Sequence, residues 1–312
     1  MTDLTSAVAE YLTYCQQIRR LNAKTIKAYR CDLRQFEEWL HKNKMQFGER
    51  AIFGYLAFMN ATYAPSSAKR KIASIRAFSA HLYSRNRAKD PFNLIEVRIK
   101  EPKRLPRTIP LVDLKRIIGE PLEASDDPSN YIPVRNKMIA ELLIASGIRI
   151  SELCSLDEHH FDSGSRSLLI MGKGSKERMI QIESDKTLSA FAVYLKALHA
   201  FRAELGVEET SSKALFINRF GARLTEQSAR NALNRLTSEA GVLLHVTPHM
   251  FRHTFATMLL EGDVDIRYIQ ALLGHSSVKT TEIYTHVTST KLREIMKCKN
   301  PRDLVGGPIG TE

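Results

Sequence analysis

The sequence predicts a mainly helical α+β protein with two domains and one small antiparallel sheet in the second domain. Apolar residues recur at spacings of three and four along most of the chain, which is typical of amphipathic helices. The one clear β-signal is a pair of short apolar stretches on either side of Gly172–Ser175. A segment with three prolines separates a basic first third from a charge-balanced remainder. A length of 312 residues is sufficient for two hydrophobic cores.

Residues 1–95 are predicted to form a bundle of four helices. The apolar positions of the first two helices each define one face: Val8, Leu12 and Cys15, then Ile26, Tyr29, Leu33, Phe36 and Leu40. The third helix, residues 51–59, is short and apolar enough to be fully buried. The fourth, residues 66–82, has an apolar face that we expect to point inward and a basic face that we expect to point outward.

The first third of the chain carries all of the excess positive charge. Residues 1–108 contain 21 Lys and Arg against 9 Asp and Glu, which equals the net charge of +12 of the whole chain. This asymmetry is typical of a module that binds a polyanion, although a basic face that only confers solubility remains open. The side chains expected to contact a phosphate backbone are Lys69, Arg70, Lys71, Arg76, Lys103, Arg104 and Arg107.

Residues 96–110 contain three prolines and five basic residues, so we expect an extended linker and not a helix. Such a linker either lies along a duplex or is a tether in solvent. Residues 111–298 are predicted to form the second domain, and residues 299–312 a disordered tail.

Several classes of protein are disfavoured. No apolar run reaches the roughly 18–20 residues of a membrane helix, and the N-terminus lacks the basic flank of a signal peptide. Four cysteines without CxxC spacing indicate a reducing cytoplasm. The segment 172–178 lacks P-loop spacing, so no nucleotide is expected. His249 and His253 are not followed by a carboxylate at metal-site spacing, and His159 and His160 are expected to point apart, so no metal or other cofactor is predicted.

The second domain contains polar residues at the ends of its predicted elements. A hairpin of residues 165–171 and 177–182 has Lys173 near its tip, and residues 214–218 form a further short strand. Thr247 and Pro248 begin a helix with His249 and Arg252 on one face. The next helix, residues 266–273, ends at Gly274, which places His275 after a helix end and Tyr284 nine residues further on.

Together these side chains suit the transfer of a phosphodiester to a phenol. The guanidinium groups of Arg149 and Arg252 are suited to bind phosphate oxygens through bidentate hydrogen bonds and to stabilise their developing charge. A tyrosine hydroxyl has a pKa of about 10 and needs a base to become a nucleophile. His249 is suited to accept that proton, His275 to donate to a phosphate oxygen and Lys173 to protonate the leaving 5′ oxygen. Glu152 either holds Arg149 or forms an ordinary surface pair.

These motifs closely resemble those of the tyrosine recombinase (phage integrase-like) family, especially its compact Xer-type members. The matching segments are residues 145–156, 172–178, 247–277 and 280–287. Residues 1–95 resemble the family's helical, SAM-like core-binding domain by pattern and charge. The resemblance implies that the family's six catalytic positions are all present: Arg149, Lys173, His249, Arg252, His275 and Tyr284.

The resemblance also implies a site-specific recombinase that forms a 3′-phosphotyrosine and exchanges strands through a Holliday junction. Its partners are double-stranded DNA with short inverted core sites and three further copies of itself, with a second related recombinase also compatible. We expect it in the cytoplasm, associated with the nucleoid. The helix at 288–298 is expected to dock on a neighbouring protomer through Leu292, Ile295 and Met296 in preference to its own domain.

The biological role remains open. Because the first predicted helix begins within the first ten residues, we expect no additional arm-binding domain. Xer-like dimer resolution, inversion and integration of a small mobile element all fit, and the sequence does not reveal the DNA target. A type IB topoisomerase and a non-catalytic DNA-binding regulator are the less favoured alternatives.

Overall fold

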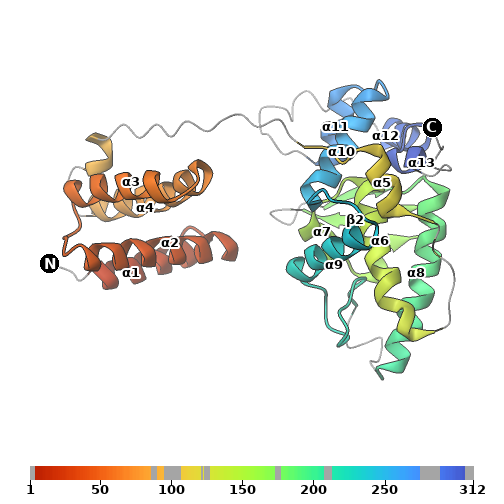
Figure 1. The fold of residues 1–312 in the computed structure, drawn as a ribbon, viewed down its shortest axis with the longest axis horizontal. Coiled ribbons are helices and arrows are strands. Elements are labelled where there is room, and N and C mark those ends of the chain that lie inside the picture. The colour runs from red at the N-terminus through yellow and green to blue at the C-terminus, as the bar shows by residue number, and fades with distance from the viewer. Residues whose placement is uncertain are drawn as a thin grey trace. The chain divides into compact units, whose positions relative to one another are not determined.

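The structure is a computed structural model that describes residues 4–85, 90–94, 107–120, 122, 127–172, 177–206, 213–274 and 289–305. Its helices and one small sheet confirm the mainly helical α+β prediction (Figure 1). The chain divides into two compact units, Met1–Arg104 and Leu105–Glu312, each with its own hydrophobic core. None of the described helices is long and apolar enough to cross a membrane.

The first unit is a bundle of four helices followed by a 3-10 turn: α1 (Leu4–Gln17), α2 (Ala23–Lys42), α3 (Glu49–Thr62), α4 (Pro65–Arg85) and η1 (Pro91–Leu94). The predicted apolar faces of α1 and α2 are buried, apart from the half-buried Tyr29. Helix α3 is longer than expected, and its Phe53 is 66% exposed, so the prediction of a fully buried helix was wrong. Only one side of α3 packs on α2, α4 and η1.

Helices α2 and α4 share a buried polar contact around Asp32, which is fully buried. Its carboxylate accepts hydrogen bonds from Ser74 Oγ at 2.7 Å and from Arg70 Nη1 at 2.5 Å, and Lys71 Nζ lies 3.5 Å away. The Lys71 ammonium also donates to Gln35. The predicted outward position of Lys71 was therefore wrong, because a buried carboxylate requires a cation beside it.

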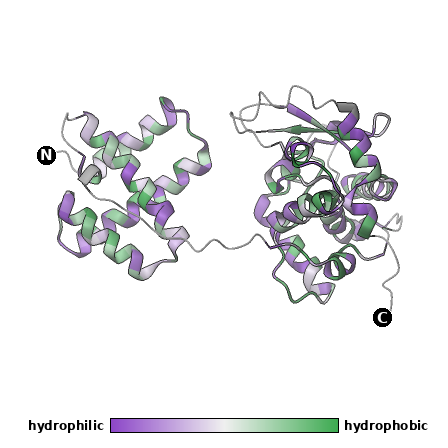
Figure 2. Cartoon of the chain, turned by 90° about the horizontal axis from the view of Figure 1, so that it is seen from above, coloured by the Kyte–Doolittle hydropathy of each residue, from purple (hydrophilic) through white to green (hydrophobic). Residues whose placement is uncertain are grey.

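The second unit is organised around α6, which is buried over most of its length. Helices α8, α9, α10 and α13 pack on α6. Figure 2 shows hydrophobic and hydrophilic stretches alternating along the helices of each unit. The elements of the second unit are α5 (Leu111–Ile118), η2 (Pro128–Asn130), α6 (Tyr131–Ser146), α7 (Ile150–Ser155), η3 (Glu158–His160), β1 (Phe161–Asp162), β2 (Ser167–Met171), β3 (Glu177–Gln181), α8 (Asp185–Glu204), α9 (Glu226–Glu239), α10 (Pro248–Glu261), α11 (Ile266–Leu273), α12 (Ser289–Cys298) and α13 (Pro301–Val305).

The sheet is antiparallel in the order β1-β2-β3, and Ile170 of β2 pairs with Arg178 of β3. The predicted hairpin is thus confirmed. Residues 214–218 were predicted as a strand but make only isolated bridges, between Asp157 and Ala214 and between Ile217 and Arg223.

The C-terminal helices pack on their own unit. Met296 of α12 is fully buried and Ile295 is 9% exposed within the single chain, and the docking of this helix on a neighbouring protomer stays a prediction. Residues 301–305 form α13, held by a 2.5 Å contact between Arg302 Nε and Glu141 Oε1, both nearly buried. The prediction of a disordered tail was therefore wrong for these residues, and residues 306–312 lie outside the described part.

The end of the predicted linker belongs to the second unit. Ile109 is buried, and its amide donates to Thr254 Oγ1 at 2.8 Å. Residues 95–106 lie outside the described part of the chain. The bridging role of the linker therefore stays a prediction.

Candidate active site

Arg149 lies at the start of α7, immediately after a sharp turn. Gly147 ends α6 in the left-handed conformation, with φ of 64°, and Arg149 is the N-cap of α7. Glu152 follows in the first turn, where its carboxylate accepts the Arg149 amide at 2.8 Å and Arg149 Nη1 at 2.9 Å. The bond from the Arg149 amide is the half of a capping box in which the N3 carboxylate accepts the N-cap amide. The Arg149 side chain is 40% exposed whereas that of Glu152 is 6% exposed, so Glu152 holds Arg149 from within the protein.

Arg178 of β3, which was not among the predicted site residues, binds the same carboxylate. Its Nη1 and Nη2 donate to Glu152 Oε1 and Oε2, both at 2.9 Å, in a bidentate ion pair. Burial alone would raise the pKa of Glu152, but the hydrogen bonds from Arg178 and Arg149 lower it to about 2. The signal in the sequence was position: Arg178 lies on the strand that follows the Lys173 turn.

Arg252 of α10 reaches the same region from a second helix. It is buried, and its Nη1 and Nη2 donate to the carbonyl oxygens of Gly147 at 2.8 Å and Leu273 at 2.7 Å. Burial, with the charges of Arg149 and Arg178, lowers the pKa of Arg252 to about 10. These hydrogen bonds tie α10 to the end of α6 and to the end of α11.

His249 is exposed in the first turn of α10. The helix begins as predicted, because Thr247 caps it by accepting from the Met250 amide at 3.4 Å and Pro248 follows. Arg252, three residues later, is buried. The exposed imidazole of His249 is thus accessible to a large substrate.

Lys173, His275 and Tyr284 lie outside the described residues, so their positions stay predictions. The described residues that flank two of them do meet. A Cβ added to Gly274, the residue before His275, would lie 2.9 Å from Arg178 Nε and 3.0 Å from its Cδ. The hairpin that carries Lys173 and the helix end that precedes His275 therefore converge at Arg178.

The basic residues predicted to contact DNA differ in exposure. Lys69, Arg70 and Arg76 are exposed on α4, and Arg70 is in contact with Asp32. Arg107 is exposed in the second unit, and Lys103 and Arg104 lie outside the described residues. Lys71, at 6% exposure, is not free to bind a phosphate directly.

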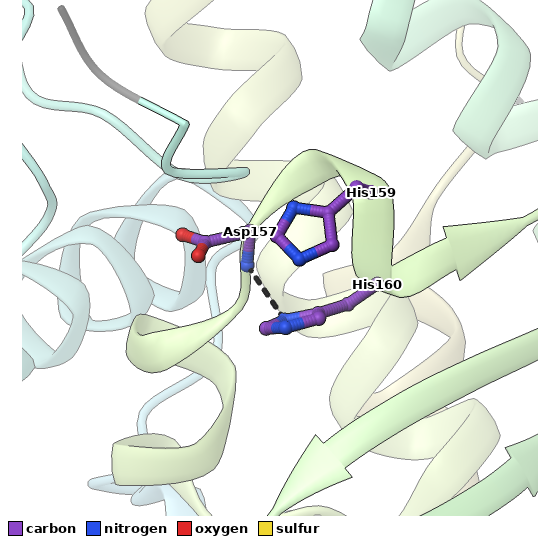
Figure 3. Close-up of side chains that lie close together, drawn as sticks. All are labelled: Asp157, His159 and His160. Atoms are coloured by element: carbon purple, nitrogen blue, oxygen red, sulfur yellow. Dashed lines mark hydrogen bonds between the residues drawn. The ribbon is translucent and has the colours of Figure 1, made fainter.

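A separate cluster follows α7 and consists of Asp157, His159 and His160. The imidazole rings of the two histidines lie 4.4 Å apart, contrary to the prediction that they point apart. In Figure 3 the three side chains lie close together, and an oxygen of the Asp157 carboxylate lies within 4.8 Å of a ring nitrogen of each histidine. That carboxylate binds Arg223, and Nδ1 of His160 accepts the Asp157 amide at 3.0 Å. The Asp157 carboxylate and Nδ1 of His160 therefore already have protein partners.

Comparison with known proteins identifies the family. The phage integrase family model matches residues 113–291, and the phage integrase N-terminal SAM-like domain matches residues 8–86. A tyrosine recombinase of Agathobacter rectalis is 41% identical over 97% of this chain and 98% of its own length. Tyrosine recombinase XerC of Myxococcus xanthus is 34% identical, and XerD of Listeria monocytogenes is 35% identical, each over 97% of this chain and 100% of its own length.

Solved structures support the same fold. XerH site-specific recombinase bound to difH substrate is 21% identical with a TM-score of 0.63, over 90% of this chain and 82% of that chain. A lambda integrase dimer bound to a COC′ core site is 16% identical with a TM-score of 0.64, over 88% of this chain and 95% of that chain. With the match of the family model and the full-length relatives, these findings show that the chain belongs to the phage integrase family of tyrosine recombinases.

Proposed function

We propose that this protein is a site-specific DNA recombinase in which Tyr284 attacks a DNA phosphodiester and forms a 3′-phosphotyrosine. The observation that carries the proposal is the arrangement of Arg149 and Arg252. One is held by Glu152 and the other by two backbone carbonyls, and the charge of Arg149 acts on the pKa of Arg252. Two fixed guanidinium groups in one region form a receptor for a single phosphate.

The charge of this region suits the transition state. Arg149 and Arg178 bind the carboxylate of Glu152, and Arg252 interacts electrostatically with all three, which leaves an excess of positive charge. A phosphodiester carries one negative charge and gains more on its equatorial oxygens during transfer. Cations fixed before the reaction stabilise that added charge without reorganising.

The remaining groups handle protons. His249 accepts the proton of the Tyr284 hydroxyl as the tyrosine oxygen bonds to phosphorus and the bond to the 5′ oxygen breaks. Lys173 gives a proton to that 5′ oxygen, and His275 donates a hydrogen bond to the phosphate. Attack by a 5′ hydroxyl on the phosphotyrosine reverses these steps. Because the phosphotyrosine conserves the bond energy, rejoining needs no nucleotide, metal or other cofactor.

DNA binding is assigned to both units. We assign residues 1–95 as a core-binding domain that uses Lys69, Arg70 and Arg76 on α4. We assign residues 96–110 as a basic linker along the duplex, with Lys103, Arg104 and Arg107, and residues 111–298 as the catalytic domain. Phosphate contacts of this kind set register and affinity, whereas base contacts set sequence preference.

We further propose a homotetramer on DNA that exchanges strands through a Holliday junction between short inverted core sites, in the cytoplasm with the nucleoid. The support is the family and one fold relative, a lambda integrase tetramer bound to a Holliday junction, which is 14% identical with a TM-score of 0.62 over 94% of this chain and 78% of that chain. The full-length relatives named XerC and XerD favour a Xer-like role, and a second recombinase as partner fits the same set.

The test is to trap DNA on the protein in cells and to sequence it. Cells expressing the full chain are lysed in denaturant, and DNA covalently bound to protein is recovered. We expect a short recurrent site with an inverted repeat and a fixed spacing between cuts. Recovery of DNA with no common sequence would contradict site-specific recombination and would favour a topoisomerase. Absence of any adduct would favour a non-catalytic DNA-binding protein.

A further inference from the structure

Arg178 connects three parts of the catalytic unit. Its guanidinium donates two hydrogen bonds of 2.9 Å to the carboxylate of Glu152, and Glu152 in turn holds Arg149. Its side chain is 19% exposed, so this ion pair lies largely out of water, where its geometry is maintained better than that of a surface pair.

The other side of Arg178 contacts the end of α11. Gly274 has φ of 65°, and an added Cβ would lie only 2.9–3.0 Å from Nε, Cδ and Cζ of Arg178. The glycine therefore allows the arginine to pack directly on the backbone that leads to His275. Leu273, the residue before it, accepts from Arg252 at 2.7 Å.

Arg178 is also fixed to the hairpin. It pairs with Ile170 in the β2–β3 ladder, and the turn between these strands carries Lys173. One side chain thus links the hairpin, the start of α7 and the end of α11. Each of these three elements leads to a residue of the proposed catalytic set: Lys173, Arg149 and His275.

We propose that Arg178 is a positioning residue for strand cleavage. It acts through Glu152 to fix the guanidinium of Arg149 against the scissile phosphate, and it keeps the hairpin in register with the end of α11. It does not itself contact the phosphate. This inference rests on the proposed recombinase function.

The test uses the full-length protein and the core site recovered from trapped DNA. Single-turnover cleavage is measured at saturating protein, with DNA affinity and melting temperature measured for each variant. Arg178→Gln is expected to cleave about 100-fold more slowly, since a small misplacement of a positioning group costs about that factor. Its DNA affinity is expected to stay within about twofold, because the phosphates outside the site supply most of the binding.

A modified substrate separates positioning from general damage. A methylphosphonate at the scissile position removes one charged oxygen, so a fixed Arg149 matters less there. We expect the defect of Arg178→Gln to shrink to below about tenfold on this substrate, since a neutral phosphorus centre lacks the charge that a guanidinium stabilises. An equal defect on both substrates would refute the proposal.

Two further variants test whether the guanidinium of Arg178 is needed and whether Arg178 acts through Glu152. Arg178→Lys keeps the positive charge but lacks the planar guanidinium that forms the bidentate ion pair. We therefore expect it to cleave at least about tenfold more slowly than wild type. The double variant Glu152→Gln/Arg178→Gln removes both buried charges, and we expect it to be no slower than the slower single variant, because both act through Arg149. Wild-type rates for Arg178→Lys, or additive losses in the double variant, would overturn the proposal.

Arg267→Gln is the matched control. Arg267 also forms a bidentate ion pair, through Nε and Nη2 with Asp265, but its side chain is 59% exposed. We expect cleavage within about twofold of wild type, as for an exposed ion pair. If the wild-type protein forms no covalent DNA adduct, the proposed function fails. If the wild type cleaves and Arg178→Gln cleaves equally well, only the positioning role fails.

Discussion

Gly147→Ala is the substitution for which the structure gives the sharpest expectation. Gly147 joins α6 to Arg149 with φ of 64°, a conformation that costs a residue with a Cβ about 1–2 kcal/mol. The added Cβ would lie 2.5 Å from Cδ1 of Phe255 and 3.0 Å from Cδ2 of Leu273. Both side chains are buried, in an interior that is close-packed in folded proteins. Overpacking of this kind costs a further 1–3 kcal/mol, roughly.

The two costs together predict a loss of about 2–5 kcal/mol in the free energy of unfolding. For a unit of this size each kcal/mol lowers the melting temperature by about 2–4 °C, so we expect a decrease of about 4–20 °C. Activity should also fall where the protein stays folded. The Gly147 carbonyl accepts from Arg252, and a shift of this backbone moves the guanidinium. A tenfold to hundredfold slower cleavage is the order expected of such a misplacement.

Gly241→Ala is the matched control, since Gly241 has φ of 65° and an added Cβ would meet nothing within 4 Å. It should show the backbone cost alone, about 1–2 kcal/mol. The assay is thermal unfolding of the full-length variants, followed by single-turnover cleavage at a temperature where both are folded. Melting temperatures of the two variants within about 2 °C of each other would refute the reasoning, because the contact with Phe255 would then cost nothing.

Three further predictions follow. The pKa of Glu152 is lowered from 4.5 to about 2, so its contribution to stability is present above pH 4.5 and is lost as the pH falls toward 2. The difference in melting temperature between wild type and Glu152→Gln should therefore shrink over that interval, and a constant difference would contradict it. Arg302→Met leaves the buried carboxylate of Glu141 without its cation and should cost about 3–5 kcal/mol in denaturant unfolding, which Arg302→Met/Glu141→Leu should largely restore. Lys71→Ala should lower the melting temperature, whereas Lys69→Ala should lower DNA affinity and reduce the slope of its salt dependence by about one; the reverse pattern would contradict the assigned roles.

Much of the fold and of the site could be predicted because it depends on residues that are close in sequence. The Thr247–Pro248 helix start, the glycine end of α11 and the β2–β3 hairpin all depend on residues adjacent in sequence. The spacing of Arg149 and Glu152 left open whether Glu152 holds Arg149, and the contact forms because the first turn of a helix brings an N3 carboxylate to its N-cap.

The errors came from contacts distant in sequence. Lys71 was placed outward by its charge, but Asp32 on another helix supplies a buried counter-ion. Residues 301–305 were predicted to be disordered because the partner of Arg302 is Glu141, far earlier in the chain. Arg178 was missed for the same reason, since its role depends on Glu152 and Gly274 meeting across three elements.

The central claim is that Tyr284 is the nucleophile. The most direct measurement is mass spectrometry of the peptide that remains attached to DNA after cleavage of a suicide substrate. We predict a nucleotide-linked peptide modified at Tyr284, with no adduct from Tyr284→Phe and a normal adduct from Tyr268→Phe, a change at a tyrosine of α11. An adduct on any other residue, or an undiminished adduct from Tyr284→Phe, would contradict the account.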